Sequence, residues 1–444
     1  MKLMDIDRNA AILSEISEEP SAKISFFEYL YVFVLIIYAG LASSFVRSFS
    51  FDKPVAMLLP ISLGVILALR NRIAFNRQFY LFLSGFVIYF FMSTVKYSEI
   101  HPRFFTNLIL DIIVAYITVK ALRFKLFIIY EHLMYYMAIV GLVMWMFQMV
   151  MGGDNLLNLM ARIPSIDTFS NVTGGGFNMI VYSVQPSMFM RQDYSIIRNC
   201  GFAWEPGGFA VYLALAIYIN LFFLKSEVKF NKRFWIMFLA LASTQSTTGY
   251  VIFIMLLVVY FFQTNMKMVL LFLPVIILVI VLLFSLPFMR DKIVKYYDEA
   301  LRADLVVEQS VGAQYTQNPQ RFASFVIAIQ DFIENPILGY GGHLEDRWFT
   351  KIKANITPIS GIGNFLAQYG LVGFLLFIAF LTKTSRAFSS HFNYNGTFLF
   401  FLMMLLISVS YSIIMVVLIM SFWMFAFFEN CESSENPSND LEKT

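Results

Sequence analysis

Charged and small residues gather near residue 200 in a pattern that suits phosphate chemistry. Arg198 is followed by Gly201 and then by Glu205-Pro206-Gly207-Gly208. Arginine offers a planar fork of N–H donors to phosphate, and glycines let a ligand approach the backbone closely. Glu205 can take a proton from an attacking hydroxyl. An interfacial ion pair between Arg198 and Glu205, with Trp204 in the aromatic belt of a membrane, explains these residues equally well.

Residues 243–250 form a short polar stretch between two apolar runs. Gln245 and Thr247 in this stretch are candidates for contact with a substrate. Small hydroxyl side chains also fasten transmembrane helices to one another, and this structural role is the more common one.

A second group of candidates lies farther along the chain. Arg321 precedes an amphipathic stretch that closes with Asn335-Pro336 and a glycine-rich turn containing Tyr340 and His343. Asn-Pro followed by glycines predicts a turn after a helix. A lone histidine is more often structural than catalytic, so His343 ranks behind Glu205 as a candidate base.

The composition indicates which kind of protein must position these residues. Of 444 residues, 59% are hydrophobic and 14% are charged, and the mean hydropathy is +0.70. Soluble domains average about half apolar and a quarter charged residues, so a water-soluble enzyme is excluded. So much apolar surface also excludes disorder, and long unbroken apolar runs argue against a β-barrel. An all-α polytopic membrane protein is predicted.

Hydrophobic runs predict the transmembrane helices. A helix needs about 20 apolar residues to cross a bilayer, and we expect about twelve such helices, within a range of about 10 to 13. The runs lie near 26–46, 54–69, 79–95, 107–122, 126–150, 207–224, 234–246, 249–262, 268–288, 361–381, 397–407 and 409–428. They define a transmembrane domain, 26–428, between a cytoplasmic segment, 1–25, and a tail, 429–444, whose polar composition is typical of disorder.

Basic residues in the short loops predict the orientation, because cytoplasmic loops retain lysine and arginine. Residues 70–77, 120–125 and 225–233 are rich in these side chains, whereas the short loops on the other face carry few. Both termini are therefore expected in the cytoplasm. The long segments 151–206 and 289–360 are expected on the outer face, where long loops are usually functional.

These motifs together resemble the bacterial O-antigen polymerases, within the superfamily of O-antigen polymerases and ligases. The resemblance rests on Arg198-x-x-Gly201-x-x-x-Glu205-Pro206-Gly207, Ser246-Thr247-Thr248-Gly249, Arg321, Asn335-Pro336-x-x-Gly339-x-Gly341 and Gln368-Tyr369-Gly370-Leu371-x-Gly373. It spans roughly residues 195–375. O-antigen ligases usually carry a histidine followed by asparagine where this chain has Ile359-Ser360-Gly361-Ile362-Gly363-Asn364. That departure favours a polymerase and removes the family's usual candidate base.

The resemblance implies a glycosyltransferase of the bacterial inner membrane with an active site that faces the periplasm. It would transfer a growing glycan from undecaprenyl diphosphate to the non-reducing end of another lipid-linked repeat unit. Arg198 and Arg321 are the expected diphosphate ligands, because arginines can stabilise the leaving group without a metal. The expected bases are Glu205 and then His343, and no metal or cofactor is expected. Weaker candidates for substrate contact are Trp204, Gln245, Thr247 and Tyr340.

Two alternative functions stay open. An O-antigen ligase breaks the same bond but transfers the glycan to lipid A-core or to a protein. A polysaccharide or lipid transporter makes no covalent change, but the sequence shows no inverted repeat of the kind that transporters tend to contain. The expected partners are the lipid-linked substrate and the bilayer, with a chain-length regulator neither indicated nor excluded. The net charge of +3 argues against nucleic acid.

Overall fold

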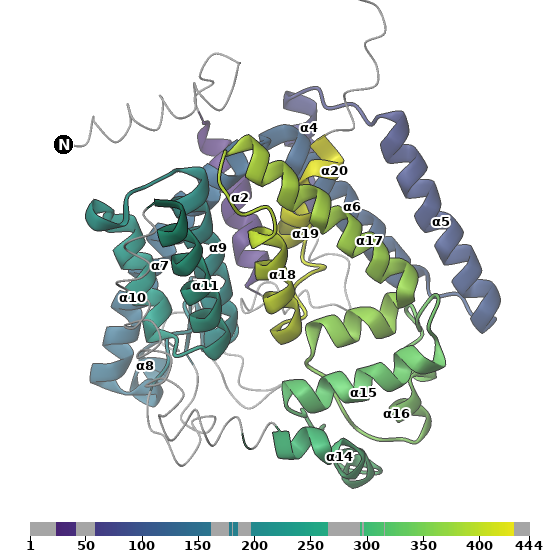
Figure 1. Ribbon diagram of the computed structural model, residues 1–444. Coiled ribbons are helices and arrows are strands. Elements are labelled where there is room, and N and C mark those ends of the chain that lie inside the picture. Colours follow the sequence, from purple (N-terminus) through teal and green to yellow (C-terminus); the bar gives the residue numbers. More distant parts are fainter. Residues whose placement is uncertain are drawn as a thin grey trace, which may run out of the picture. The chain divides into compact units, whose positions relative to one another are not determined.

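The computed structural model describes residues 24–40, 58–160, 177–179, 181–184, 197–264, 294, 297–314 and 316–429. These residues form two compact units. The first unit draws on Met1–Ile73 and Ile117–Tyr250, and the second on Ala74–Tyr116 and Val251–Thr444. Nearly all regular structure in both units is helical (Figure 1), so the predicted all-α class is confirmed.

Within the described residues, six helices are long and apolar enough to cross a membrane. They are α5 (Arg77–Tyr97), α6 (Pro102–Leu122), α7 (Lys125–Met151), α9 with its continuation η3 (Pro206–Tyr218 and Ile219–Phe223), α11 (Thr247–Thr264) and α17 (Gly361–His391). Shorter apolar helices are α2 (Phe26–Ala39), α4 (Leu58–Arg70) and α18 (Leu399–Ser410). The chain is a polytopic membrane protein. The predicted span 268–288 and the predicted tail, apart from Glu429, lie outside the described residues.

In the first unit, α7 is the helix on which three others pack. Helices α2, α9 and α10 (Lys232–Ser243) all contact it, and α10 also packs against α9 (Figure 1). Every residue of α9 is buried, which explains why this helix is apolar on all sides. The remaining elements are the 3-10 turn η4 (Val228–Phe230), α8 (Gly153–Met160) and an antiparallel pair of strands, β1 (Phe177–Met179) and β2 (Tyr182–Val184).

Local side chains determine where several of these helices begin. Ser25 opens α2 with a capping box: its hydroxyl accepts from the backbone N–H of Glu28 at 3.3 Å, and the Glu28 carboxylate accepts from the Ser25 N–H at 2.5 Å. Helix α9 begins at Pro206, one residue before the predicted run 207–224, and proline suits the first position of a helix. The predicted interruption near residue 246 is also confirmed, because α10 ends at Ser243 and α11 begins at Thr247.

In the second unit, α17 is the helix against which four others pack. These are α15 (Arg321–Glu334), α18, α19 (Val417–Trp423) and α20 (Phe425–Glu429). Helices α14 (Ala303–Ser310) and α16 (Trp348–Lys351) pack against α15, and η5 (Leu344–Asp346) leads into α16 (Figure 1). The predicted outer segment 289–360 therefore contains a small helical layer with an apolar core of its own, made of Ala303, Val307, Ile327, Phe349, Ala354 and Ile356.

The predicted span at 409–428 is wrong. The backbone leaves the helical conformation at Tyr411, where φ is −140° and ψ is 134°, and becomes helical again only in the short α19 and α20. The segment is largely buried, and the indole N–H of Trp423 donates to the carbonyl of Ile414 at 2.9 Å. Non-helical backbone at membrane depth is tolerated where protein covers it. Hydropathy here reports burial in protein, which it cannot distinguish from burial in lipid.

Candidate functional site

Arg198 is fixed by the turn between α10 and α11. Its Nε donates to the carbonyl of Thr244 at 2.9 Å, and its Nη2 donates to the carbonyl of Gln245 at 3.0 Å. Gln245 lies in the left-handed region, with φ at 49°. The structure therefore brings two sequence candidates, Arg198 and Gln245, into direct contact. An arginine has five N–H donors, and two of them are used in these bonds to described residues.

Asn199 and Gly201 hold the backbone that carries Arg198. The Asn199 side chain donates to the hydroxyl of Ser243 at 2.9 Å and accepts from the N–H of Gly201 at 2.9 Å. Gly201 has φ at 49°, and a Cβ there would lie 2.6 Å from the ring of Phe209. A glycine is therefore required at this position of the motif, on both conformational and steric grounds.

Glu205 and Trp204 follow at the start of α9. Glu205 is the residue before the first helical turn, is half-buried, and makes no side-chain capping bond to α9. Trp204 is 40% exposed, and its backbone N–H donates to the carbonyl of Gly40 at 3.0 Å. Cys200 is fully buried, and burial raises the pKa of its thiol to about 12, so it is not a nucleophile at neutral pH.

Arg321 is the first residue of α15, in the second unit. Its Nη1 donates to the backbone carbonyl of Ser410, and its guanidinium lies 4.0 Å from the centre of the Tyr411 ring. Ser410 and Tyr411 lie at the end of α18, where the backbone leaves the helical conformation inside the predicted span 409–428. Arg321 thus resembles Arg198 in being oriented by a backbone carbonyl at a break between helices.

Helix α17 is broken at Gly370, a residue of the motif from Gln368 to Gly373. Its φ of 62° and ψ of −164° are not helical. The break deprives the next residues of their helical acceptors, and the segment before η5 supplies replacements. The N–H of Leu371 donates to the carbonyl of Pro336 at 2.7 Å, and that of Val372 to Ile337 at 3.3 Å. A Cβ on Gly370 would collide with the carbonyl of Ile337.

The same segment also supplies donors to α17. The N–H of Tyr340 donates to the carbonyl of Ala367 at 2.9 Å, and that of Gly341 to Gln368 at 2.8 Å. Gly339, with φ at 67°, lies so close that a Cβ would collide with the carbonyl of Gln368. The motif from Asn335 to Gly341 and the motif from Gln368 to Gly373 therefore satisfy each other's backbone groups, which accounts for Gly339 and Gly370.

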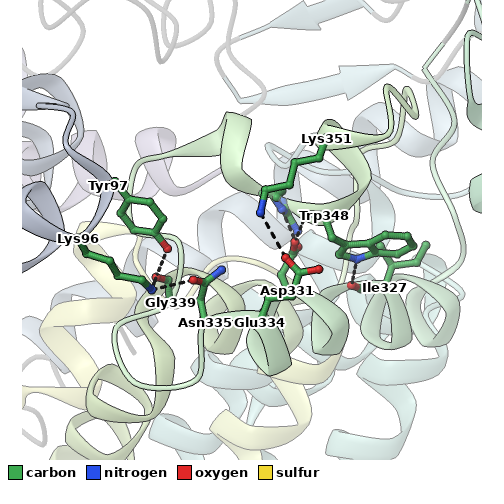
Figure 2. Close-up of polar contacts among 10 residues, drawn as sticks. Lys96, Tyr97, Ile327, Asp331, Glu334, Asn335, Gly339, Trp348 and Lys351 are labelled. Carbon is green, nitrogen blue, oxygen red and sulfur yellow. Dashed lines mark hydrogen bonds and ion pairs between the residues drawn. The ribbon is translucent and has the colours of Figure 1, made fainter.

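The end of α5 also donates hydrogen bonds to the segment between α15 and η5. Figure 2 shows Lys96 donating to the side-chain oxygen of Asn335, at 2.7 Å, and the hydroxyl of Tyr97 donating to the carbonyl of Gly339, at 2.8 Å. The predicted turn after the helix is confirmed, because α15 ends at Glu334 and these residues follow it. Sequence reasoning did not assign Lys96 or Tyr97 to the turn, since they lie more than 200 residues upstream.

A buried ion pair lies beside Tyr340. Arg347 Nε donates to Asp331 at 2.8 Å, and both side chains are at least nine-tenths buried. The Arg347 guanidinium also lies 4.8 Å from the Tyr340 ring and donates to the side-chain oxygen of Asn364 at 3.3 Å. Tyr340 is only 4% exposed, so this geometry gives it a packing role against Arg347.

His343 lies beside two residues of the α5–α6 connection, Glu99 and His101. The His343 ring is 1% exposed, and burial first and His101 second lower its pKa below the usual value for histidine. One ligand atom from each of the three residues lies within 4.8 Å of the other two. Sequence reasoning missed this cluster because its members come from distant parts of the chain and match no local metal motif.

The sequence candidates thus belong to two separate groups. Arg198, Trp204, Glu205 and Gln245 lie in the first unit together with Thr247, the first residue of α11. Arg321, Tyr340 and His343 lie in the second unit.

The fold and these residues define a polytopic helical membrane protein in which motif arginines are held by backbone carbonyls at breaks between helices. Residues 233–378 match the family model described as O-antigen ligase. The match contains the motifs from Ser246 to Gly373 and excludes Arg198 and Glu205. It confirms the relation to the O-antigen polymerase and ligase superfamily. No curated protein and no solved structure matches the chain.

Proposed function

We propose that this chain is an O-antigen-type polysaccharide polymerase of the bacterial inner membrane. It transfers a growing glycan from undecaprenyl diphosphate to the non-reducing end of another lipid-linked repeat unit, on the periplasmic face. The family match and the apolar helices support a membrane-bound enzyme of ligase or polymerase type. The choice of polymerase, the substrate and the site residues are our proposal.

The observation that carries the proposal is the fixed orientation of Arg198. Two of its five N–H donors are bonded to the carbonyls of Thr244 and Gln245. A guanidinium oriented in advance can stabilise developing charge without reorganising at the moment of reaction. Arg321, which is also bonded to a carbonyl, is the second proposed diphosphate ligand.

The proposed reaction breaks one bond and forms one. The bond between the anomeric carbon of the growing glycan and the diphosphate oxygen breaks, and its electron pair leaves with undecaprenyl diphosphate. A hydroxyl of the acceptor repeat forms the new glycosidic bond, and its proton passes to a base. Glu205 is the proposed base, because it is a half-buried carboxylate at the start of α9, seven residues after Arg198 in the sequence. His343 is the second candidate.

The start of α17 favours a polymerase over a ligase. O-antigen ligases usually carry a histidine followed by asparagine at this position, and this chain has no histidine there. Ser360 caps the helix instead, and the side-chain oxygen of Asn364 accepts a hydrogen bond from Arg347. The matched family model is described as O-antigen ligase, so a ligase stays the second candidate function.

Purified protein in proteoliposomes tests the proposal. Given only undecaprenyl-diphosphate-linked repeats, it should produce a ladder of longer lipid-linked glycans and release undecaprenyl diphosphate. The Arg198→Ala protein is the matched negative control. A product that forms only after lipid A-core or a protein acceptor is added would show a ligase instead. Substrate that crosses the membrane unchanged would show a transporter.

A further inference from the structure

His343 is a buried side chain with two ring nitrogens that can form hydrogen bonds. Neither Nδ1 nor Nε2 has a hydrogen-bond partner among the described residues, and the side chain is 1% exposed. Buried imidazole nitrogens normally have a partner, and one without any calls for an explanation such as a bound ion. The ring is held in place by Tyr97, which stacks on it at a centroid distance of 4.3 Å.

The turn that carries His343 lies close to α5 and α6 because of two glycines. Gly341 has φ at 59°, and a Cβ there would approach the hydroxyl of Ser93 on α5 at 3.0 Å. A Cβ on Gly342 would lie 2.7 Å from Phe104 on α6. The backbone is thus placed where His343 can meet the connection between these two helices.

Glu99 and His101 lie on that connection, next to His343. The His101 ring stands edge-on to the His343 ring, with centroids 4.2 Å apart. The Nε2 of His101 lies 3.3 Å from a carboxylate oxygen of Glu99. An ion pair explains the contact between Glu99 and His101 but leaves His343 without a partner. An ion shared by all three side chains would satisfy every one of them.

Two imidazoles and one carboxylate are the donor set of an open zinc site. We propose that Glu99, His101 and His343 bind one divalent transition-metal ion, with Zn²⁺ as the best fit. Two ligands of a tetrahedral zinc ion lie about 3.4 Å apart when each bond is about 2.1 Å. The Nε2 of His101 and the carboxylate oxygen of Glu99 are already 3.3 Å apart. The ligand atoms of all three residues lie within 4.8 Å of one another, so the longest separation has to shorten by about 1.4 Å at most.

The position of the site indicates what the ion does. It fastens the α5–α6 connection to the turn after Gly341, close to the contact between Tyr97 and Gly339. Glu99 is 64% exposed and His101 35%, so water can occupy the remaining coordination position. The reaction proposed above uses no ion, so the metal site and the proposed function share only His343. His343 as a metal ligand competes with His343 as second candidate base.

Metal binding by the full-length protein in detergent tests the inference. The protein carries an affinity tag without histidine, is stripped with chelator and dialysed, and is then titrated with Zn²⁺ while bound metal and the thermal midpoint are measured. We expect one tightly bound ion per chain and a midpoint that rises with Zn²⁺ concentration. Mg²⁺ should produce neither effect, because it prefers oxygen ligands.

The deciding variants are His101→Ala and Glu99→Ala, which change partly exposed side chains and should fold. Both should lose at least about tenfold in Zn²⁺ affinity and most of the midpoint shift. His391→Ala, which removes a histidine at the far end of α17, is the matched control and should bind zinc as the unaltered protein does. Failure of the unaltered protein to rebind zinc, or full binding by His101→Ala, overturns the inference.

Discussion

The Nη2 of Arg198 donates a 3.0 Å hydrogen bond to the backbone carbonyl oxygen of Gln245. The two residues belong to different candidate segments of the sequence, and Gln245 adopts a left-handed backbone conformation with φ at 49°. The direction of the guanidinium is therefore determined by the shape of the turn between α10 and α11. The two candidate segments therefore meet at this turn.

Arg198→Ala should abolish polymer while the protein stays in the membrane at its normal level. Arg198→Lys should restore only part of the activity, because a single ammonium group cannot reproduce the planar fork that spans two carbonyls and a phosphate. The measurement is the length distribution of lipid-linked glycan, with membrane protein quantified in parallel. Arg386→Ala, an exposed arginine on α17, is the control and should be fully active. Loss of the protein itself would show that Arg198 is needed for folding.

Arg321→Ala should likewise abolish polymer without removing the protein. Tyr411→Leu should have a smaller effect, since it removes the ring 4.0 Å from the guanidinium but keeps the backbone carbonyl of Ser410 that orients Arg321. A cation–π contact is worth about 0.5–2 kcal/mol, so a loss of up to about thirtyfold in rate is expected if the contact positions the charge. Full activity in Arg321→Ala would remove this residue from the diphosphate site.

Arg347→Ala should destabilise the second unit more than any exposed substitution nearby. It leaves the buried Asp331 carboxylate without its 2.8 Å partner, which typically costs about 3–5 kcal/mol. Lys351→Ala is a matched control, because its pair with Glu334 is exposed and is worth about 0–1 kcal/mol (Figure 2). Thermal unfolding in detergent measures both. Equal midpoints for the two variants would contradict a structural role for the buried pair.

The predicted orientation can be tested with two exposed positions. Leu305 on α14 is 48% exposed and Phe230 in η4 is 76% exposed, so neither is hidden by its own unit. In cells with a permeabilised outer membrane, Leu305→Cys should react with an impermeant thiol reagent, whereas Phe230→Cys should react only after lysis. Of the two native cysteines, Cys200 is buried, and Cys431 is replaced by serine in both variants so that only the introduced thiol reports. The opposite labelling pattern would reverse the topology and remove the argument for a periplasmic site.

Local signals in the sequence were sufficient for much of the fold. Pro206 and the polar stretch around Ser246 marked helix ends correctly, because they act on the backbone within one turn. The broken segment 409–428 could not be foreseen, since hydropathy measures apolar character and not which neighbour covers it. The sequence identifies the candidate arginines by their residue type. It does not identify the carbonyls that orient them, because these belong to residues 46 to 89 positions away. His343 was noticed, while its neighbour His101 was not.

The backbone bonds between residues 336–341 and α17 have a consequence for folding. The amides of Tyr340, Gly341, Leu371 and Val372 are each held by a carbonyl of the other segment. Neither segment can fray alone, because opening one exposes the polar groups of both, so these four amides should exchange with deuterium in a single cooperative event. In folding terms, α17 is a short helix before Gly370 and a long one after it, and their junction is completed by a segment that the ribosome has made earlier.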